Sequence, residues 1–263
     1  MLYNSIPVAM YHHAAPTDRE LNIYPDLFED QLRVLSRRGW KTLSGDEFLY
    51  FLENEKEKPG KCVLLTFDDG FADNYVYAYP LLKKFKMKAM IFVATDFIAD
   101  ADVKRDSFTA LSHNAARDLA DSERRHEVMC TWKELEEMET SGVIDIQSHG
   151  ISHKTPDLIK AKRYEELKED LAGGKAILEK RLSKKIYHFA WPRGHFDETG
   201  IKIASEIGYK ALYTTERGCN TGKDLKALNR LPVKNRNGRW LMKNLRIYSS
   251  VFLTGFYLAI RTG

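Results

Sequence analysis

Short apolar runs alternate along this 263-residue chain with longer segments that repeat their apolar residues at the helical period. This alternation is typical of strand–helix units, in which a helix crosses over between neighbouring strands of a parallel sheet. We interpret the apolar runs as strands; they are residues 6–11, 62–67, 89–93, 143–147, 186–190, 211–214 and 227–231. A parallel sheet needs cover on both faces, so the pattern predicts an α/β fold, a distorted (β/α)7-type barrel.

The helical period is clearest in four segments between these strands, residues 25–38, 132–141, 164–182 and 197–207. Residues 96–129 break the alternation with a long polar stretch, which we interpret as an insertion at the rim of the barrel. The length of the chain suits a single core. We therefore predict one domain over residues 1–263.

The charge pattern argues against a nucleic-acid partner. The chain carries 41 Lys and Arg against 37 Asp and Glu, a formal net charge of +4. Acidic and basic residues interleave, as in residues 160–185, whereas a nucleic-acid binder gathers its basic residues on one face. The cysteines, Cys62, Cys130 and Cys219, lie far apart without a Cys-x-x-Cys pair, so we expect neither a disulfide framework nor a thiolate zinc site.

The two ends of the sequence indicate where in the cell the protein is expected. The first residues lack a basic region followed by a long apolar run, so we expect no secretory signal and a cytoplasmic protein by default. No stretch approaches the roughly 20 apolar residues that span a bilayer. The C-terminal segment 248–263 is apolar and aromatic, and it predicts either a packed terminal helix or a contact with a membrane surface or a partner, which would make the protein membrane-peripheral.

Metal-ligating side chains follow two of the predicted strands. Asp68 and Asp69 end one strand, and His149 and His153 come after a later one. Active sites of parallel barrels lie at these carboxyl ends. Two imidazoles and one carboxylate suit zinc or another divalent transition metal with a position left open for water, while the second carboxylate stays free to move protons. Gly150 stands where a His-Glu-x-x-His protease has its Glu, which argues against that class.

The chain resembles a known family in four motifs, residues 66–70 (TFDDG), 131–135 (TWKEL), 148–153 (SHGISH) and 189–194 (FAWPRG). These motifs are similar to those of the polysaccharide deacetylases of the NodB-homology type, carbohydrate esterase family four, and the resemblance covers about residues 6–233. It implies a metal site of Asp69, His149 and His153, with zinc as the expected ion and cobalt, nickel or manganese as alternatives. It also implies Asp68 as the general base in hydrolysis of an N-acetyl group on an amino sugar.

Two further roles follow from the resemblance. The backbone N–H of Arg193 takes the position that stabilises the oxyanion in the family. The usual C-terminal Leu-x-His is absent, but residues 9–13 (AMYHH) resemble the subgroup of poly-N-acetylglucosamine deacetylases, whose histidine motif has moved to the N-terminus. His12 is therefore the expected general acid, and His13 is the alternative; a strand-end histidine that only makes hydrogen bonds stays open for either.

The third motif departs from the family pattern. Ala190 and Trp191 replace its first residues, including the arginine that usually holds the catalytic aspartate. Arg230, at the end of a predicted strand, is a candidate for that charge, and a surface ion pair is the alternative. Trp191 could stack on a sugar or belong to the core.

The sequence is compatible with three functions. The first is a metal-dependent hydrolase that removes N-acetyl groups from a glycan or glycan precursor. An O-acetyl esterase would use the same site. The altered motifs also allow a glycan-binding domain with impaired catalysis, although such a domain does not need the free carboxylate of Asp68.

Overall fold

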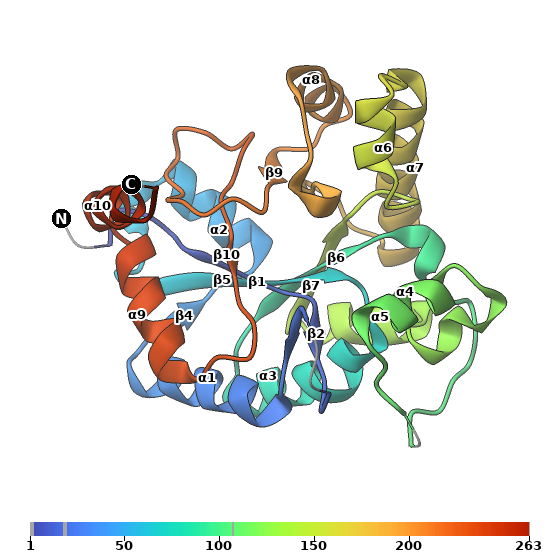
Figure 1. The fold of residues 1–263 in the computed structure, drawn as a ribbon, viewed down its shortest axis with the longest axis horizontal. Coiled ribbons are helices and arrows are strands. Elements are labelled where there is room, and N and C mark those ends of the chain that lie inside the picture. The colour runs from blue at the N-terminus through green and yellow to red at the C-terminus, as the bar shows by residue number, and fades with distance from the viewer. Residues whose placement is uncertain (1–2, 18–19, 107, 263) are drawn as a thin grey trace.

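The centre of the fold is a parallel sheet that curls into a half-barrel (Figure 1). The computed structural model describes residues 3–17, 20–106 and 108–262. The strands of the main sheet run in the order β10-β1-β5-β6-β7-β8-β9. Their bounds are β1 Val8–Tyr11, β5 Cys62–Asp69, β6 Ala89–Val93, β7 Ile144–Ser148, β8 His188–Ala190, β9 Ala211–Tyr213 and β10 Leu231–Pro232. Strand β4 (Lys41–Thr42) pairs with the start of β5, and β2 (His13–Ala14) pairs separately with β3 (Asn22–Ile23).

The two edges of the half-barrel are linked by one segment near the C-terminus. Tyr213 of β9 forms a parallel bridge with Leu228, and β10 three residues later pairs with β1. The seven expected strands are thus present in the expected order around a curled sheet, which confirms the α/β fold. The last strand is shorter than predicted because Leu228 already pairs with β9 before the chain reaches β1.

Alternation along β5 positions the paired aspartates. All eight residues of β5 are buried, as expected of a parallel strand that is covered on both faces. Leu65 and Phe67 pack in the outer cluster beneath the helices, whereas Leu64 packs in the cluster inside the half-barrel. Asp68 lies four residues after Leu64, and residues an even number apart on a strand point to the same face, so the Asp68 side chain points to the inside of the half-barrel. Asp69 would point outward, but its φ of 75° turns the chain as the strand ends.

Helices cover the outer face of the sheet (Figure 1). The four predicted helices are present with ends that differ by one residue at most, whereas residues 45–53, 79–85, 155–160 and 238–248 form four further helices that were not predicted. The α-helices are α1 Pro25–Arg37, α2 Gly45–Glu53, α3 Tyr79–Phe85, α4 His113–Ala120, α5 Trp132–Thr140, α6 Thr155–Lys160, α7 Tyr164–Leu182, α8 Glu198–Glu206, α9 Gly238–Tyr248 and α10 Val251–Thr262. Helix α5 begins at a capping box in which Thr131 and Glu134 cap each other.

Residues 96–129 form the expected insertion beside the aspartates. Helix α4 and the 3-10 segment Glu123–Glu127 pack on a small apolar cluster that includes Phe71 and Phe97. Phe71, two residues after Asp69, bridges to Met129 at the end of the insertion. The insertion therefore lies at the carboxyl end of the sheet.

The C-terminal segment is helical but only one face of it is packed. Helix α9 packs against α1, and α10 follows after two residues. Thr254 of α10 is buried, whereas Phe252 is 80% exposed. None of the described helices is both long and apolar enough to span a membrane.

Candidate active site

Asp69, His149 and His153 meet at the carboxyl end of the sheet. Asp69 Oδ1 lies 3.6 Å from His149 Nε2 and 3.3 Å from His153 Nε2. One donor atom from each of the three residues lies within 4.8 Å of the others. Asp69 Oδ1 is buried and has no hydrogen-bond partner among the described residues. A buried carboxylate oxygen that faces two imidazole nitrogens fits a divalent cation, which would satisfy all three atoms.

The backbone around the histidines turns them toward Asp69. Gly150 and His153 have φ values of 86° and 59°, so the chain curls back between the two imidazoles. His149 Nδ1 lies 2.7 Å from the carbonyl oxygen of Ala190, which can only accept, so Nδ1 carries the proton. The lone pair of His149 Nε2 therefore points into the cluster, as in metal-binding histidines.

Electrostatics keep His153 and Asp69 in their metal-binding forms. Burial lowers the pKa of His153 to about 3, although the charge of Asp69 opposes that shift. Burial raises the pKa of Asp69, but the imidazoles of His153 and His149 outweigh it and hold the pKa below its usual range. A neutral imidazole and an ionised carboxylate are the forms that bind metal.

Asp68 is free of this cluster and is held by Arg230. Arg230 Nη1 donates to Asp68 Oδ1 at 2.6 Å, and Arg230 Nε donates to the carbonyl oxygen of Thr214 at 2.7 Å. The Arg230 side chain is fully buried, so the alternative of a surface ion pair is wrong. Burial raises the pKa of Asp68, but Arg230 and then His12 outweigh it, and the net pKa is lowered.

His12 and His13 have different surroundings. His12 Nε2 lies 3.8 Å from Asp68 Oδ2, and burial lowers the pKa of His12. His13 Nδ1 lies 2.6 Å from Asp73 Oδ2, and its Nε2 lies 3.1 Å from His113 Nδ1. Only His12 is thus placed beside the free carboxylate, whereas His13 belongs to a separate hydrogen-bonded group.

The third motif contributes a turn and a core residue. Arg193 has φ 55° in the turn after Pro192, and its side chain is exposed. Trp191 is 0% exposed and packs edge-on against Phe189, with ring centroids 4.9 Å apart. A sugar cannot stack on a ring that has no exposed face, so the interpretation of Trp191 as a sugar platform is wrong and the core alternative is correct.

Three residues near the site were not found from the sequence. Asp73 holds His13, and Arg117 of α4 places Nη1 4.0 Å from Asp69 Oδ1. Asp170 of α7 accepts hydrogen bonds from the backbone N–H groups of Ile151 and Ser152, between the two histidines. Arg117 and Asp170 are far from the motifs in sequence and carry no local pattern. Asp73 follows Asp69 closely, and its proximity to that motif was the one signal available.

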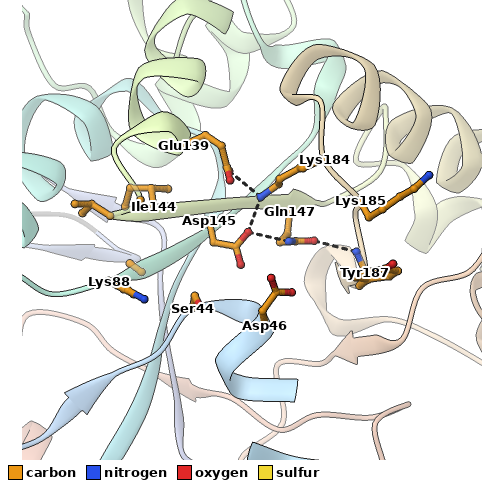
Figure 2. A pocket seen from close by; sticks show the side chains of 13 residues that line it. Ser44, Asp46, Lys88, Glu139, Ile144, Asp145, Gln147, Lys184, Lys185 and Tyr187 are labelled. Atoms are coloured by element: carbon orange, nitrogen blue, oxygen red, sulfur yellow. Dashed lines mark hydrogen bonds and ion pairs between the residues drawn. The ribbon is translucent and has the colours of Figure 1, made fainter. Parts of the chain in front are cut away.

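A hollow with a cavity volume of about 260 Å³ lies at the opposite end of the strands (Figure 2). It opens near Lys88 and Ile144, at the start of β6 and β7. Lys184 Nζ bridges Glu139 and Asp145 there, at 2.7 and 2.6 Å. Glu139 and Asp145 are thus neutralised by Lys184, and no cluster of metal-ligating side chains is found there among the described residues, so we assign the chemistry to the carboxyl end.

Comparison with known proteins agrees with this geometry. A family model described as polysaccharide deacetylase matches residues 55–212. The chain belongs to the polysaccharide deacetylase family. The matched region contains Asp68, Asp69, His149, His153 and the third motif, whereas His12 and Arg230 lie outside it.

Individual relatives extend the similarity beyond that region. YxkH of Bacillus subtilis (strain 168), named as a polysaccharide deacetylase, is 29% identical over 229 residues, which cover 87% of this chain and 71% of YxkH. The poly-beta-1,6-N-acetyl-D-glucosamine N-deacetylase of Staphylococcus aureus (strain MSSA476) is 28% identical over 196 residues. That alignment covers 72% of this chain and 59% of the Staphylococcus protein, so the chain spans less than two thirds of that relative.

Solved structures show the same fold. The Streptococcus pyogenes deacetylase PplD, determined in complex with acetate, superposes with a TM-score of 0.75 at 29% identity, covering 92% of this chain and 98% of PplD. IcaB from Ammonifex degensii superposes with a TM-score of 0.76 at 24% identity, over 92% of this chain and 97% of IcaB. Both comparisons confirm the single curled sheet with its surrounding helices.

Proposed function

We propose that the chain is a metal-dependent deacetylase that hydrolyses N-acetyl groups on an amino-sugar glycan or glycan precursor. The family match and the Staphylococcus N-deacetylase support the class of substrate. The single observation that carries the proposal is the separation of roles between two adjacent carboxylates. Asp69 faces two imidazoles, whereas Asp68 faces a guanidinium and His12.

A divalent cation, with zinc as the best match to the donor set, would be held by Asp69, His149 and His153, where it would polarise the acetyl carbonyl and lower the pKa of a water to about 7. Asp68 accepts the proton of the attacking water. Its lowered pKa keeps it ionised, and Arg230 fixes its orientation. A base that is already charged and oriented contributes roughly 10²–10⁴-fold to rate.

His12 delivers a proton to the departing amine. Its lowered pKa leaves it neutral in the free protein at neutral pH, so it needs to gain a proton during the reaction. Asp68 Oδ2, 3.8 Å away, is the adjacent group that has just taken one from water. As the C–N bond breaks, the nitrogen takes this proton and leaves as a neutral amine. We assign the oxyanion contact to the backbone N–H of Arg193, in the left-handed turn after Pro192.

The test combines metal analysis with acetate release. We expect purified protein to bind one divalent ion per chain, and Asp69→Ala to lose that ion. We expect the metal-loaded protein to release acetate from β-1,6-linked N-acetylglucosamine oligomers, and Asp68→Asn to bind metal normally but lose most turnover.

O-acetylated xylan separates the competing functions. Turnover of the ester alone would establish an O-acetyl esterase and contradict the proposal. Sugar binding without turnover of either substrate by the metal-loaded protein would establish the impaired glycan-binding domain instead.

A further inference from the structure

Helix α10 presents an apolar face to solvent. Phe252, Phe256 and Ile260 are 80%, 65% and 64% exposed, and they follow one another at intervals of four residues. Val251 is also exposed, whereas Thr254 on the opposite side of the helix is buried against the body of the protein. The exposed sector of residues 251–260 contains no charged residue. Large apolar side chains gathered in this way mark an interaction surface.

The sequence around this helix is strongly basic. Residues 225–263 contain eight Lys and Arg and no Asp or Glu, whereas residues 1–224 contain 33 Lys and Arg and 37 Asp and Glu. Five of these eight basic residues are exposed, and none of the five lies within 4.0 Å of an acidic group among the described residues; they are Lys234, Arg236, Arg239, Lys243 and Arg246. The net positive charge of the chain therefore comes from residues 225–263.

A cavity of about 170 Å³ joins the basic residues to α10. Arg217, Lys234 and Arg236 line it together with Trp240 of α9 and Tyr257 of α10, and no acidic residue lines it. Tyr257 is one residue from Phe256 and three from Ile260, so the cavity opens beside the apolar face. A concave site with three cations and two aromatic rings suits a phosphate group.

We propose that the apolar face of α10 and the adjoining three-cation cavity dock the protein on an anionic lipid surface. The helix would lie in the interface with Phe252, Phe256 and Ile260 among the acyl chains, and the cavity would take a lipid phosphate. Apolar insertion and attraction of Lys and Arg to anionic lipids are the two forces that hold interfacial helices.

Charge favours a lipid surface over a second copy of the chain. A symmetric dimer through α10 would bring two sets of unpaired cations toward each other, because a two-fold interface uses the same patch on both subunits. An anionic membrane instead neutralises them. Arg217 lies three residues beyond Thr214, which binds Arg230, so the docking surface adjoins the catalytic rim. If the proposed function holds, acetylated sugars at a membrane surface are the substrates within reach.

The test is co-sedimentation of the full chain with vesicles. We expect binding to phosphatidylcholine vesicles that contain phosphatidylglycerol, weaker binding to pure phosphatidylcholine, and a loss of binding at ~0.5 M NaCl, where charges are screened within a few ångströms. Phe252→Ser with Phe256→Ser should weaken binding at least ~10-fold. Lys234→Gln with Arg236→Gln should remove the preference for anionic lipid.

Matched controls come from other surfaces. Tyr50→Ser removes an exposed aromatic ring on α2, and Lys168→Gln with Lys180→Gln removes two exposed charges on α7. Both controls should bind vesicles as the parent does. Every variant should keep the parent's turnover of a soluble acetylated oligosaccharide and its melting temperature, so docking is scored independently of the proposed activity.

Three outcomes would overturn the proposal. The first is binding that the aromatic substitutions leave unchanged. The second is a concentration-dependent dimer that the same substitutions abolish, which would mean that a second copy covers α10. The third is an affinity for inorganic phosphate that depends on Lys234 and Arg236 without any vesicle binding, which would assign the cavity to a free anion.

Discussion

Asp170 Oδ1 accepts two hydrogen bonds from Ser152, one from its backbone N–H at 3.0 Å and one from its hydroxyl at 2.6 Å. The other carboxylate oxygen of Asp170 accepts the N–H of Ile151 at 3.1 Å. Asp170 is buried in the middle of α7, so a regular helix holds the loop that carries both imidazoles. Gly150 has no Cβ, and this lets the loop approach α7 closely: a Cβ there would lie 2.4 Å from Asp170 Oδ2.

We expect Asp170→Ala to weaken metal binding by about 10–100-fold, because the loop between His149 and His153 loses three acceptor contacts. Titration with Zn²⁺ measures the affinity directly. Asp170→Asn is the matched control; it keeps an oxygen that can accept from Ser152, so its affinity should fall between those of the parent and the alanine variant. A parent-like affinity in a folded Asp170→Ala protein would show that the loop holds its shape without this clamp.

Removal of Arg230 should shift the pH dependence of activity. Burial raises the pKa of Asp68 and Arg230 is the largest influence that lowers it, so Arg230→Met leaves only the weaker effect of the neighbouring histidines against burial and the pKa rises. Asp68 acts as a base only when ionised, and activity is lost as pH falls through its pKa. The acid limb of the kcat/KM profile should therefore move to higher pH, and turnover should recover partly as pH is raised.

Arg230→Lys keeps a cation and should give a smaller shift. Loss of one partner from a buried ion pair costs about 3–5 kcal/mol, so the melting temperature of each variant is measured alongside. An acid limb at the same pH in a folded Arg230→Met protein would mean that Asp68 is not the group that titrates.

Substitutions of the neighbouring histidines should have unequal effects. His12→Gln should lower kcat by roughly 10²–10⁴-fold, because it removes the imidazole beside Asp68 Oδ2. His13→Gln should lower kcat less and lower the melting temperature more, since His13 Nδ1 lies 2.6 Å from buried Asp73. Steady-state kinetics and thermal unfolding separate the two. The reverse order of effects on kcat would make His13 the acid.

The strands and the clustering of Asp69 with His149 and His153 could be predicted because their signals are local. Each parallel strand is a continuous apolar run, and the side chains that follow such runs are brought together by the topology alone. The proposal of Arg230 as the partner of Asp68 followed the same logic, since Arg230 lies at the end of a predicted strand. Arg230 and Asp68 are 162 residues apart in the sequence, yet Arg230 Nη1 lies 2.6 Å from Asp68 Oδ1.

The residues that hold the histidine loop in place could not be predicted in the same way. Asp170 is one of several acidic residues on α7, and the sequence does not show which of them faces the histidine loop. The role of Trp191 could not be predicted either. Its position in the motif was compatible with stacking on a sugar, and only its complete burial in the structure shows that it belongs to the core. Helix α2 was missed because the strand before it has only two residues and does not stand out as an apolar run.

His188 should make the stability of the fold depend on pH. Its side chain is fully buried inside the half-barrel, where Nδ1 lies 2.8 Å from the hydroxyl of Tyr213 and Nε2 has no hydrogen-bond partner among the described residues. Burial lowers the pKa of His188 to about 4, although Asp145 opposes that shift. Between an unfolded pKa of about 6.5 and this value, the unfolded chain binds a proton that the folded chain does not.

The free energy of unfolding should therefore fall as pH is lowered from about 6.5 toward 4, by on the order of 3 kcal/mol from this group. Urea denaturation at several pH values measures the slope. Other groups titrate over the same range, so the difference between the parent and His188→Gln isolates the contribution: the variant should lose less stability over this interval. His195→Gln is the control for replacing an imidazole, because that side chain is exposed. Parallel slopes for the parent and His188→Gln would mean that the buried imidazole takes up its proton as readily in the folded chain as in the unfolded one.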